Sequence, residues 1–158
     1  MAGSVYIETT VLSAHFSHRE DAASVYRRDV TRQWWAQQSA QYELCTSLAV
    51  LAELQSGSYP GQQDAVELAD SLARIEVSDE ALGVAEVYVR HRLMPASRAG
   101  DALHLALATL NEIDYLLTWN IRHLANPNKV EHMTVINRRL GLLSPIVVSP
   151  DMLWDESP

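Results

Sequence analysis

Three carboxylates in this chain, Glu8, Glu53 and Asp101, interrupt stretches of residues that are typical of a protein core. Carboxylates are almost never fully buried unless they are paired or bound to a metal ion. Three of them converging without a cation would repel one another and raise their pKa values. Because Mg²⁺ and Mn²⁺ prefer oxygen ligands, the combination favours a site for one of these ions.

Two of these acids, Asp101 and Glu53, also have a purely structural explanation. Asp101 begins the apolar segment AGDALHLALA, and the helix dipole favours an aspartate in a first turn by a few tenths of a kcal/mol up to about 1 kcal/mol. Glu53, within SLAVLAELQSG, fits a solvated helix face equally well. Only the combination of the three acids therefore favours a metal site.

Short apolar runs place two polar residues at the ends of strands. Residues 5–7 form one such run, which stops at Glu8, and residues 115–118 form another, which leads to Asn120. In open parallel sheets, ligands collect beyond the carboxyl ends of the strands. We therefore expect Glu8 and Asn120 to emerge at the same edge of a sheet.

Strands of three to five residues alternate with helical patterns, which predicts an α/β fold with a parallel sheet covered on both faces. The expected strands are 5–7, 42–46, 74–77, 115–118 and 146–148. The expected helices are 21–41, 48–55, a helix around 65–72, 79–91, 99–111, 129–142 and a short one opened by Ser149, Pro150 and Asp151.

The length of 158 residues fits one domain that buries about two-thirds of its unfolded surface. The single cysteine, Cys45, excludes an intrachain disulfide and a cysteine-based zinc cluster. No apolar run approaches the ~20 residues of a membrane span, and the N-terminus lacks the pattern of a signal peptide. We expect one domain over residues 1–153, a frayed tail at 154–158, no membrane association and a cytoplasmic location.

The net charge of −8 counts against nucleic acid as a partner, because nucleic-acid binders usually carry a basic surplus. A bound metal ion, however, returns positive charge to the place where a phosphate lies. Arg90, Arg92 and Arg98 flank the loop that leads to Asp101 and are the arginines that we place against phosphate. We expect a locally positive surface around them and His123.

Two histidines lie near the candidate site. His104 follows Asp101 by one helical turn, where it fits either a proton donor to a leaving group or a hydrogen-bonded core residue, and we favour the core residue. His123 follows Asn120 by three residues and is the better candidate for contacting substrate.

Four segments carry a resemblance to a known family: VYIETTVLS, TSLAVLAEL, GDALHLALA and LLTWNIRHLA. In this order and at these spacings they resemble the four acidic blocks of PIN domains, and the chain is similar to VapC-type toxins of toxin–antitoxin pairs. The resemblance covers nearly the whole chain. It implies a PIN-like three-layer α/β/α sandwich with a five-stranded parallel sheet, and a Mg²⁺- or Mn²⁺-dependent endoribonuclease with RNA as substrate and an antitoxin protein as partner.

The resemblance also implies roles for particular residues. By position, Glu8, Glu53 and Asp101 match the acidic metal ligands and Asn120 matches the fourth acid, which makes these four the candidate catalytic residues. Thr9 matches the polar residue that follows the first acid. Together with Arg98 and His123, Thr9 forms the predicted substrate-binding set. The implied reaction is in-line attack of water on a phosphodiester, with the ion stabilising charge on the phosphoryl oxygens.

Two departures from the family pattern concern the metal. The family usually has aspartate where this chain has Glu8, so the carboxylate is pushed out by one C–C bond, about 1.5 Å. Asn120 brings no charge where the family has a fourth carboxylate, so a second ion is held less well. We expect one firmly bound ion and weak activity.

Two other functional hypotheses compete with the nuclease. A catalytically weak or inactive PIN-like module that binds RNA or protein is favoured by Asn120 and the acidic balance, and is opposed by the three retained acids. A doubly wound small-molecule enzyme is disfavoured because no glycine-rich phosphate loop follows Glu8. The resemblance also implies a homodimer, which the aromatic residues Tyr26, Trp34 and Trp35 of the long helix favour independently.

Overall fold

A five-stranded parallel sheet forms the centre of the molecule in the computed structural model, which describes residues 2–156. The strand order is β3-β2-β1-β4-β5. The strands are β1 (Ser4–Ile7), β2 (Glu43–Ser47), β3 (Ala73–Ile75), β4 (Tyr115–Leu117) and β5 (Ile146–Val148). The predicted α/β fold and its five-stranded parallel sheet are confirmed.

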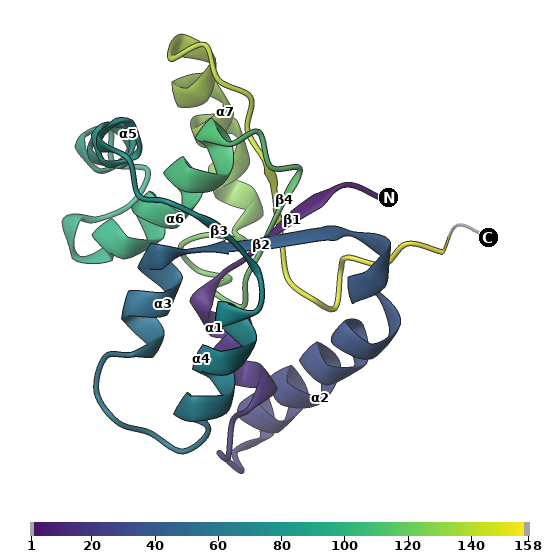
Figure 1. The fold of residues 1–158 in the computed structure, drawn as a ribbon. Coiled ribbons are helices and arrows are strands. Elements are labelled where there is room, and N and C mark those ends of the chain that lie inside the picture. Colours follow the sequence, from purple (N-terminus) through teal and green to yellow (C-terminus); the bar gives the residue numbers. More distant parts are fainter. Residues whose placement is uncertain (1, 157–158) are drawn as a thin grey trace.

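Helices cover both faces of this sheet. In Figure 1 the sheet runs between α5, α6 and α7 on one side and α1 to α4 on the other. The helices are α1 (Thr9–His15), α2 (Ala22–Gln37), α3 (Leu48–Leu54), α4 (Gln62–Asp70), α5 (Asp79–Arg90), α6 (Ala99–Leu110) and α7 (Val130–Arg139). Short 3₁₀ helices lie at Ser39–Gln41, Ala96–Arg98 and Pro127–Lys129.

The strand order reverses between β1 and β4. From β1 the chain proceeds outward to β2 and β3, then crosses back to β4 on the other side of β1 and continues to β5. In open α/β sheets, a crevice for ligands forms beyond the carboxyl ends of the strands at such a switch point. Glu8 directly follows β1, and Asn120 lies three residues after β4, so both predicted site residues stand at the switch point.

The two strands at the switch point are the most buried part of the sheet. Tyr6 and Ile7 of β1 are fully buried opposite Leu116 and Leu117 of β4. Helix α6, which the sequence predicts to be apolar on nearly every side, is buried over most of its length and packs mainly against α5. The site is therefore built on rigid elements of the core.

Two local features differ from the expected elements. Helix α1 was not predicted, and it forms because the side chain of Glu8 caps it by accepting a hydrogen bond from the Thr10 backbone N–H. The short helix predicted to begin at Ser149 is wrong, since this stretch forms a turn. Instead of continuing as a helix, the chain buries Leu153, whose carbonyl oxygen accepts a hydrogen bond from Trp34 Nε1 at 2.7 Å.

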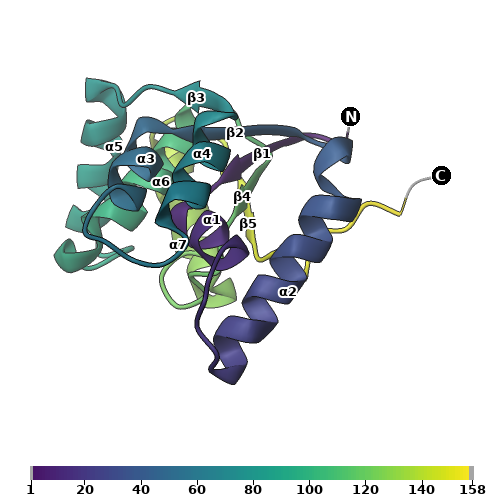
Figure 2. The same cartoon turned by 60° about the horizontal axis from the view of Figure 1, so that its bottom comes forward.

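The C-terminal segment runs past the end of α2 (Figure 2). Within the stretch 154–158, which the sequence predicts to be frayed, Trp154 packs against the core and the Asp155 N–H donates to Gln38 Oε1 at 2.7 Å. Residues 157–158 lie outside the described residues. None of the helices within residues 2–156 is long and apolar enough to span a membrane.

Candidate metal centre

Glu8 is only 2% exposed. One oxygen of its carboxylate accepts hydrogen bonds, and the other accepts none within the described residues. Oε2 accepts hydrogen bonds from Thr10 N at 2.9 Å, Thr10 Oγ1 at 2.5 Å and Thr118 Oγ1 at 2.9 Å. Within residues 2–156, no hydrogen-bond donor reaches Oε1. Burial raises the pKa of Glu8, and the charge of His104 and the Thr10 hydrogen bonds offset only part of this effect.

Glu53 comes from the last turn of α3 and lies nearer to solvent, with its side chain 42% exposed. Oε2 accepts a hydrogen bond from Thr9 Oγ1 at 2.9 Å, and Oε1 lies 2.5 Å from His104 Nε2. Burial alone would raise the pKa of Glu53, but the hydrogen bonds from His104 and Thr9 outweigh it and lower the pKa. Glu53 is therefore a charged acceptor that His104 holds in place.

His104 is fully buried beneath these acids. Its Nδ1 lies 2.7 Å from Tyr6 Oη, which in turn lies 2.7 Å from Ser47 Oγ. Burial would lower the pKa of His104, but the hydrogen bond to Glu53 and the charges of the surrounding acids raise it. This agrees with the preferred interpretation of His104 as a hydrogen-bonded core residue.

Glu8, Glu53 and His104 form one cluster. Each offers a ligand atom, and these atoms lie within 4.8 Å of one another. Two of the three acids predicted as metal ligands are thus brought together, joined by a histidine. The donors fit a divalent cation, because Glu8 has an oxygen without a donor and its buried carboxylate meets the partly exposed carboxylate of Glu53.

Asp101, the third predicted ligand, lies outside this cluster of three and pairs with Asn120. Asn120 Nδ2 donates to Asp101 Oδ2 at 3.0 Å, while Asn120 Oδ1 accepts from the His123 backbone N–H at 3.1 Å. Both ends of the Asn120 amide are therefore engaged. The charge of Asp101 acts to raise the pKa of both His104 and His123, so Asp101 lies near both histidines.

Sequence reasoning missed Thr10 and Thr118 as partners of the site. Thr10 Oγ1 also accepts from the Trp119 backbone N–H at 2.8 Å, so the two threonines tie the end of β1 to the end of β4. Their position could have indicated this role, because each adjoins a strand end that carries a predicted site residue. Thr9, which the sequence places with the substrate, bonds Glu53.

The PIN domain family model matches residues 5–127 of the chain, a range that includes Glu8, Glu53, Asp101, His104 and Asn120. The chain belongs to the PIN domain family. A search of curated protein sequences finds no match.

Several solved structures resemble this PIN domain in fold. A toxin–antitoxin complex from Klebsiella pneumoniae matches with a TM-score of 0.59 at 18% identity, covering 92% of this chain and 97% of that chain. VapBC2 from Rickettsia felis, bound to a DNA fragment from its promoter, matches with a TM-score of 0.61 at 17% identity, covering 92% and 98%. VapC20 from Mycobacterium tuberculosis, a sarcin–ricin loop cleaving toxin, matches with a TM-score of 0.55 at 21% identity, covering 71% and 86%.

A group of cations borders the PIN domain's acidic site. Burial lowers the pKa of His123, and the charges of Arg98, Lys129 and Arg122 lower it further. Arg98 is one of the arginines that the sequence places against phosphate. Arg90, another of them, instead approaches Glu86 on the same helix at 3.8 Å.

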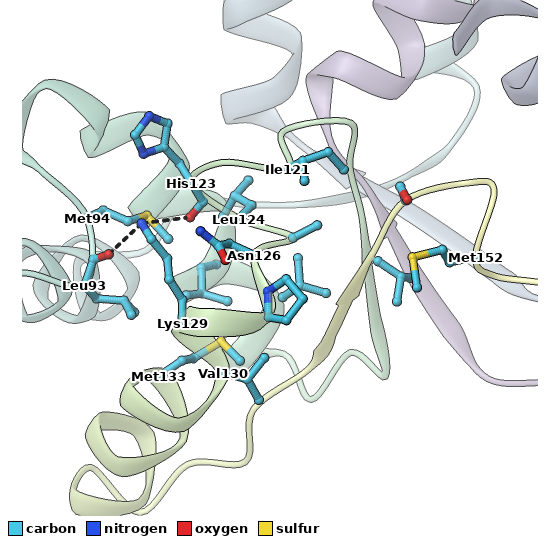
Figure 3. A pocket seen from close by; sticks show the side chains of 16 residues that line it. Leu93, Met94, Ile121, His123, Leu124, Asn126, Lys129, Val130, Met133 and Met152 are labelled. Atoms are coloured by element: carbon cyan, nitrogen blue, oxygen red, sulfur yellow. Dashed lines mark hydrogen bonds between the residues drawn. The ribbon is translucent and has the colours of Figure 1, made fainter. Parts of the chain in front are cut away.

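An apolar cavity of about 270 Å³ lies beside this border (Figure 3). The residues that line it include Ile121, Leu124, Lys129 and Met133. Lys129 Nζ donates to Leu93 O at 2.9 Å and to His123 O at 3.5 Å. These bonds fix the segment after Asn120 and so keep the cations next to Asp101.

Proposed function

We propose that this PIN domain is a Mg²⁺- or Mn²⁺-dependent endoribonuclease and the toxin of a toxin–antitoxin pair. The observation that carries the proposal is the open oxygen of Glu8, a buried carboxylate that stands beside Glu53 at the switch point of the sheet. Burying a charged carboxylate with an unused lone pair is costly, and a bound cation relieves that cost.

The proposed acidic ligands are Glu8, Glu53 and Asp101, with Asp101 reaching the ion directly or through a water. A divalent ion held there supplies a Lewis acid that stabilises charge on phosphoryl oxygens. Thr9 fixes the carboxylate of Glu53, and Asn120 fixes that of Asp101. Because both acids are oriented before substrate arrives, little reorganisation is needed when a water attacks the phosphodiester.

The cations around His123 are proposed to bind the phosphates of the substrate. Arg98, Arg122 and Lys129 supply positive charge next to the acidic site, although the chain as a whole carries a net charge of −8. An RNA strand that crosses this border would bring a phosphate towards Asp101. The solved relative that cleaves the sarcin–ricin loop supports RNA as the substrate class, and this substrate agrees with the predicted cytoplasmic location.

An antitoxin partner and a homodimer belong to the same proposal. Two of the similar solved structures are toxin–antitoxin complexes, which supports an antitoxin. For the dimer, Trp34 gives no support because it is fully buried within the chain, whereas Tyr26 of the same helix is 51% exposed. Sedimentation at micromolar concentration tests the dimer, and a monomer there would remove it.

A catalytically inactive module that binds RNA or protein is the second candidate. Asn120 favours it, because an uncharged amide whose two ends are already engaged stands where the family has a fourth acid. The two candidates differ in one property, metal-dependent cleavage of RNA.

The deciding experiment is a cleavage assay on structured RNA with and without Mn²⁺. We expect cleavage that requires Mn²⁺ or Mg²⁺ and is lost in Glu8→Gln. Glu86→Gln serves as the matched control, because it also removes one carboxylate but lies on α5 beside Arg90. RNA binding by a folded protein without cleavage under any metal condition would overturn the nuclease and favour the binding module.

A further inference from the structure

We propose that His104 is a direct metal ligand, so that an imidazole joins the carboxylates of Glu8 and Glu53 in binding the ion of this PIN domain. The inference rests on the proposed function and deepens it, because it specifies the kind of ion that the site prefers. It replaces an interpretation of His104 as a purely structural residue.

The first support is the geometry of the cluster. His104 Nε2 lies 2.5 Å from Glu53 Oε1, and a ligand atom of Glu8 completes a group within 4.8 Å. Two neighbouring ligands of an ion at about 2.1 Å are separated by roughly 3 Å. Nε2 and Oε1 therefore need to part by only about half an ångström for an ion to replace the proton between them.

The second support is the oxygen that no donor reaches. Glu8 is almost completely buried, and its Oε2 already accepts three hydrogen bonds. Oε1 has none within the described part of the chain. Oε1 is not sealed off from solvent, since His15 Nδ1 is the buried side-chain polar atom that lacks a partner within the described residues, so a ligand from outside the chain can reach it. His104 and Glu53 each offer a ligand atom within 4.8 Å of a carboxylate oxygen of Glu8.

The third support is what stands behind the imidazole. Metal-binding histidines almost always donate the other ring N–H to a hydrogen-bond partner, which fixes the ring and the tautomer. His104 Nδ1 has such a partner in Tyr6 Oη, and Ser47 Oγ holds the phenol in turn. When Nδ1–H donates to Tyr6, Nε2 presents its lone pair to the acids. All three residues are buried, so this orientation is rigid.

A nitrogen ligand changes the preferred ion. Carboxylates alone suit Mg²⁺ and Mn²⁺, whereas imidazole favours first-row transition ions over Mg²⁺. The site should therefore select Mn²⁺ and its heavier neighbours over Mg²⁺. We expect Mn²⁺ to bind at least about tenfold more tightly than Mg²⁺.

The test is pulsed electron paramagnetic resonance of the intact protein loaded with Mn²⁺. Echo modulation from a directly bound ¹⁴N nucleus is expected, and growth with ¹⁵N-labelled histidine should replace it with the ¹⁵N pattern. The measurement uses the unmodified protein, so it does not depend on whether a variant folds. A bound Mn²⁺ without nitrogen modulation would overturn the proposal.

Two variants assign the nitrogen among the six histidines of the chain. His104→Gln should lose the modulation and weaken Mn²⁺ binding by about tenfold or more, with a smaller loss for Mg²⁺. His123→Gln is the matched control, since His123 is the other histidine on which the charge of Asp101 acts. His123→Gln should keep the nitrogen modulation. Loss of the modulation in His123→Gln together with its retention in His104→Gln would overturn the assignment to His104.

The outcomes separate this inference from the proposed function. Mn²⁺-dependent RNA cleavage without nitrogen modulation means that the nuclease stands and His104 is not a ligand. Nitrogen modulation without cleavage means that the metal site stands and the nuclease fails. Absence of Mn²⁺ binding at millimolar concentration overturns both.

Discussion

Asn120 donates a hydrogen bond from Nδ2 to Oδ2 of Asp101, with 3.0 Å between the two atoms. An aspartate at position 120 could not make this bond and would place a second carboxylate against the first. The amide therefore serves as a hydrogen-bond partner that orients the Asp101 carboxylate. The departure from the family pattern at this position exchanges a charge for a hydrogen bond.

Asn120→Asp should lower the melting temperature without metal and raise it with Mn²⁺. Without metal, the two carboxylates repel each other, whereas with metal the added charge attracts the ion. A charge pair at ~4 Å and an effective dielectric constant of ~20 is worth about 4 kcal/mol before desolvation, and each ~1.4 kcal/mol is tenfold in affinity. Thermal unfolding across a Mn²⁺ titration measures both effects. Asn128→Asp adds the same charge at an exposed position and controls for net charge, and an equal response of the two variants would contradict the role of Asn120.

Asp101→Asn should abolish RNA cleavage and leave the fold intact. The new amide can still accept the hydrogen bond from Asn120, so the change in free energy of unfolding should stay within about 1 kcal/mol, the size of a helix-dipole contribution. Urea unfolding and the cleavage assay, made on the same preparation, check the two statements together. Retained cleavage would remove Asp101 from the proposed site.

Glu8→Gln should stabilise the metal-free protein at pH 7, because the neutral amide avoids the cost of burying a charged carboxylate. Burial raises the pKa of Glu8 above its ordinary value of 4.5, so the folded state binds this proton more tightly than the unfolded state. Wild-type stability from Glu8 is therefore fully present below pH 4.5 and is lost as the pH rises through the folded pKa.

The advantage of Glu8→Gln should consequently vanish near pH 4 and grow towards neutral pH. Unfolding curves of both proteins from pH 4 to 8, recorded with a chelator, give this difference directly. A saturating concentration of Mn²⁺ should reverse the order, because only the carboxylate binds the ion with charge. A difference in unfolding free energy between the two proteins that does not change with pH would mean that burial does not raise the pKa of Glu8.

Cys45 should react slowly with thiol reagents in the folded protein. Burial raises the pKa of its thiol from 9.0 to about 11, and only the thiolate is the nucleophile. At pH 8 the thiolate fraction, and with it the labelling rate, should be about a hundredfold lower than in the urea-unfolded chain. The rate should rise about tenfold per pH unit up to pH 10. Equal rates in the folded and unfolded states would show that Cys45 is not shielded.

RNA binding should weaken with added salt, because cations released from the phosphates drive it. Arg122→Gln should reduce the slope of log affinity against log salt by about 1, since Arg122 belongs to the charges around His123. Arg90→Gln should leave the slope unchanged, because Arg90 approaches Glu86 instead. Filter binding or fluorescence anisotropy in a metal-free buffer measures the slopes. The same slope for wild type and Arg122→Gln would show that RNA does not bind at the cations around His123.

The sequence by itself determined the architecture and the edge of the sheet where the site lies. The apolar runs that end at Glu8 and shortly before Asn120 are local patterns. Such buried strands can be predicted without knowing which elements pack against them. The carboxyl ends of parallel strands lie at the same edge of the sheet. The placement of Glu8 and Asn120 at that edge therefore follows from the sequence pattern alone. The identity of the acids was likewise visible, because each interrupts an apolar segment.

Only the tertiary structure decided which of these side chains meet. His104 joins Glu8 and Glu53 because α3 and α6 contact each other, and a contact between residues 51 positions apart leaves no mark on local periodicity. Asp101 and His104 are separated by a single helical turn, yet one pairs with Asn120 and the other with Glu53. Local spacing set the face of the helix, whereas packing set the partners, because Glu53 lies on α3 and His104 on α6, and only the tertiary fold brings these helices into contact.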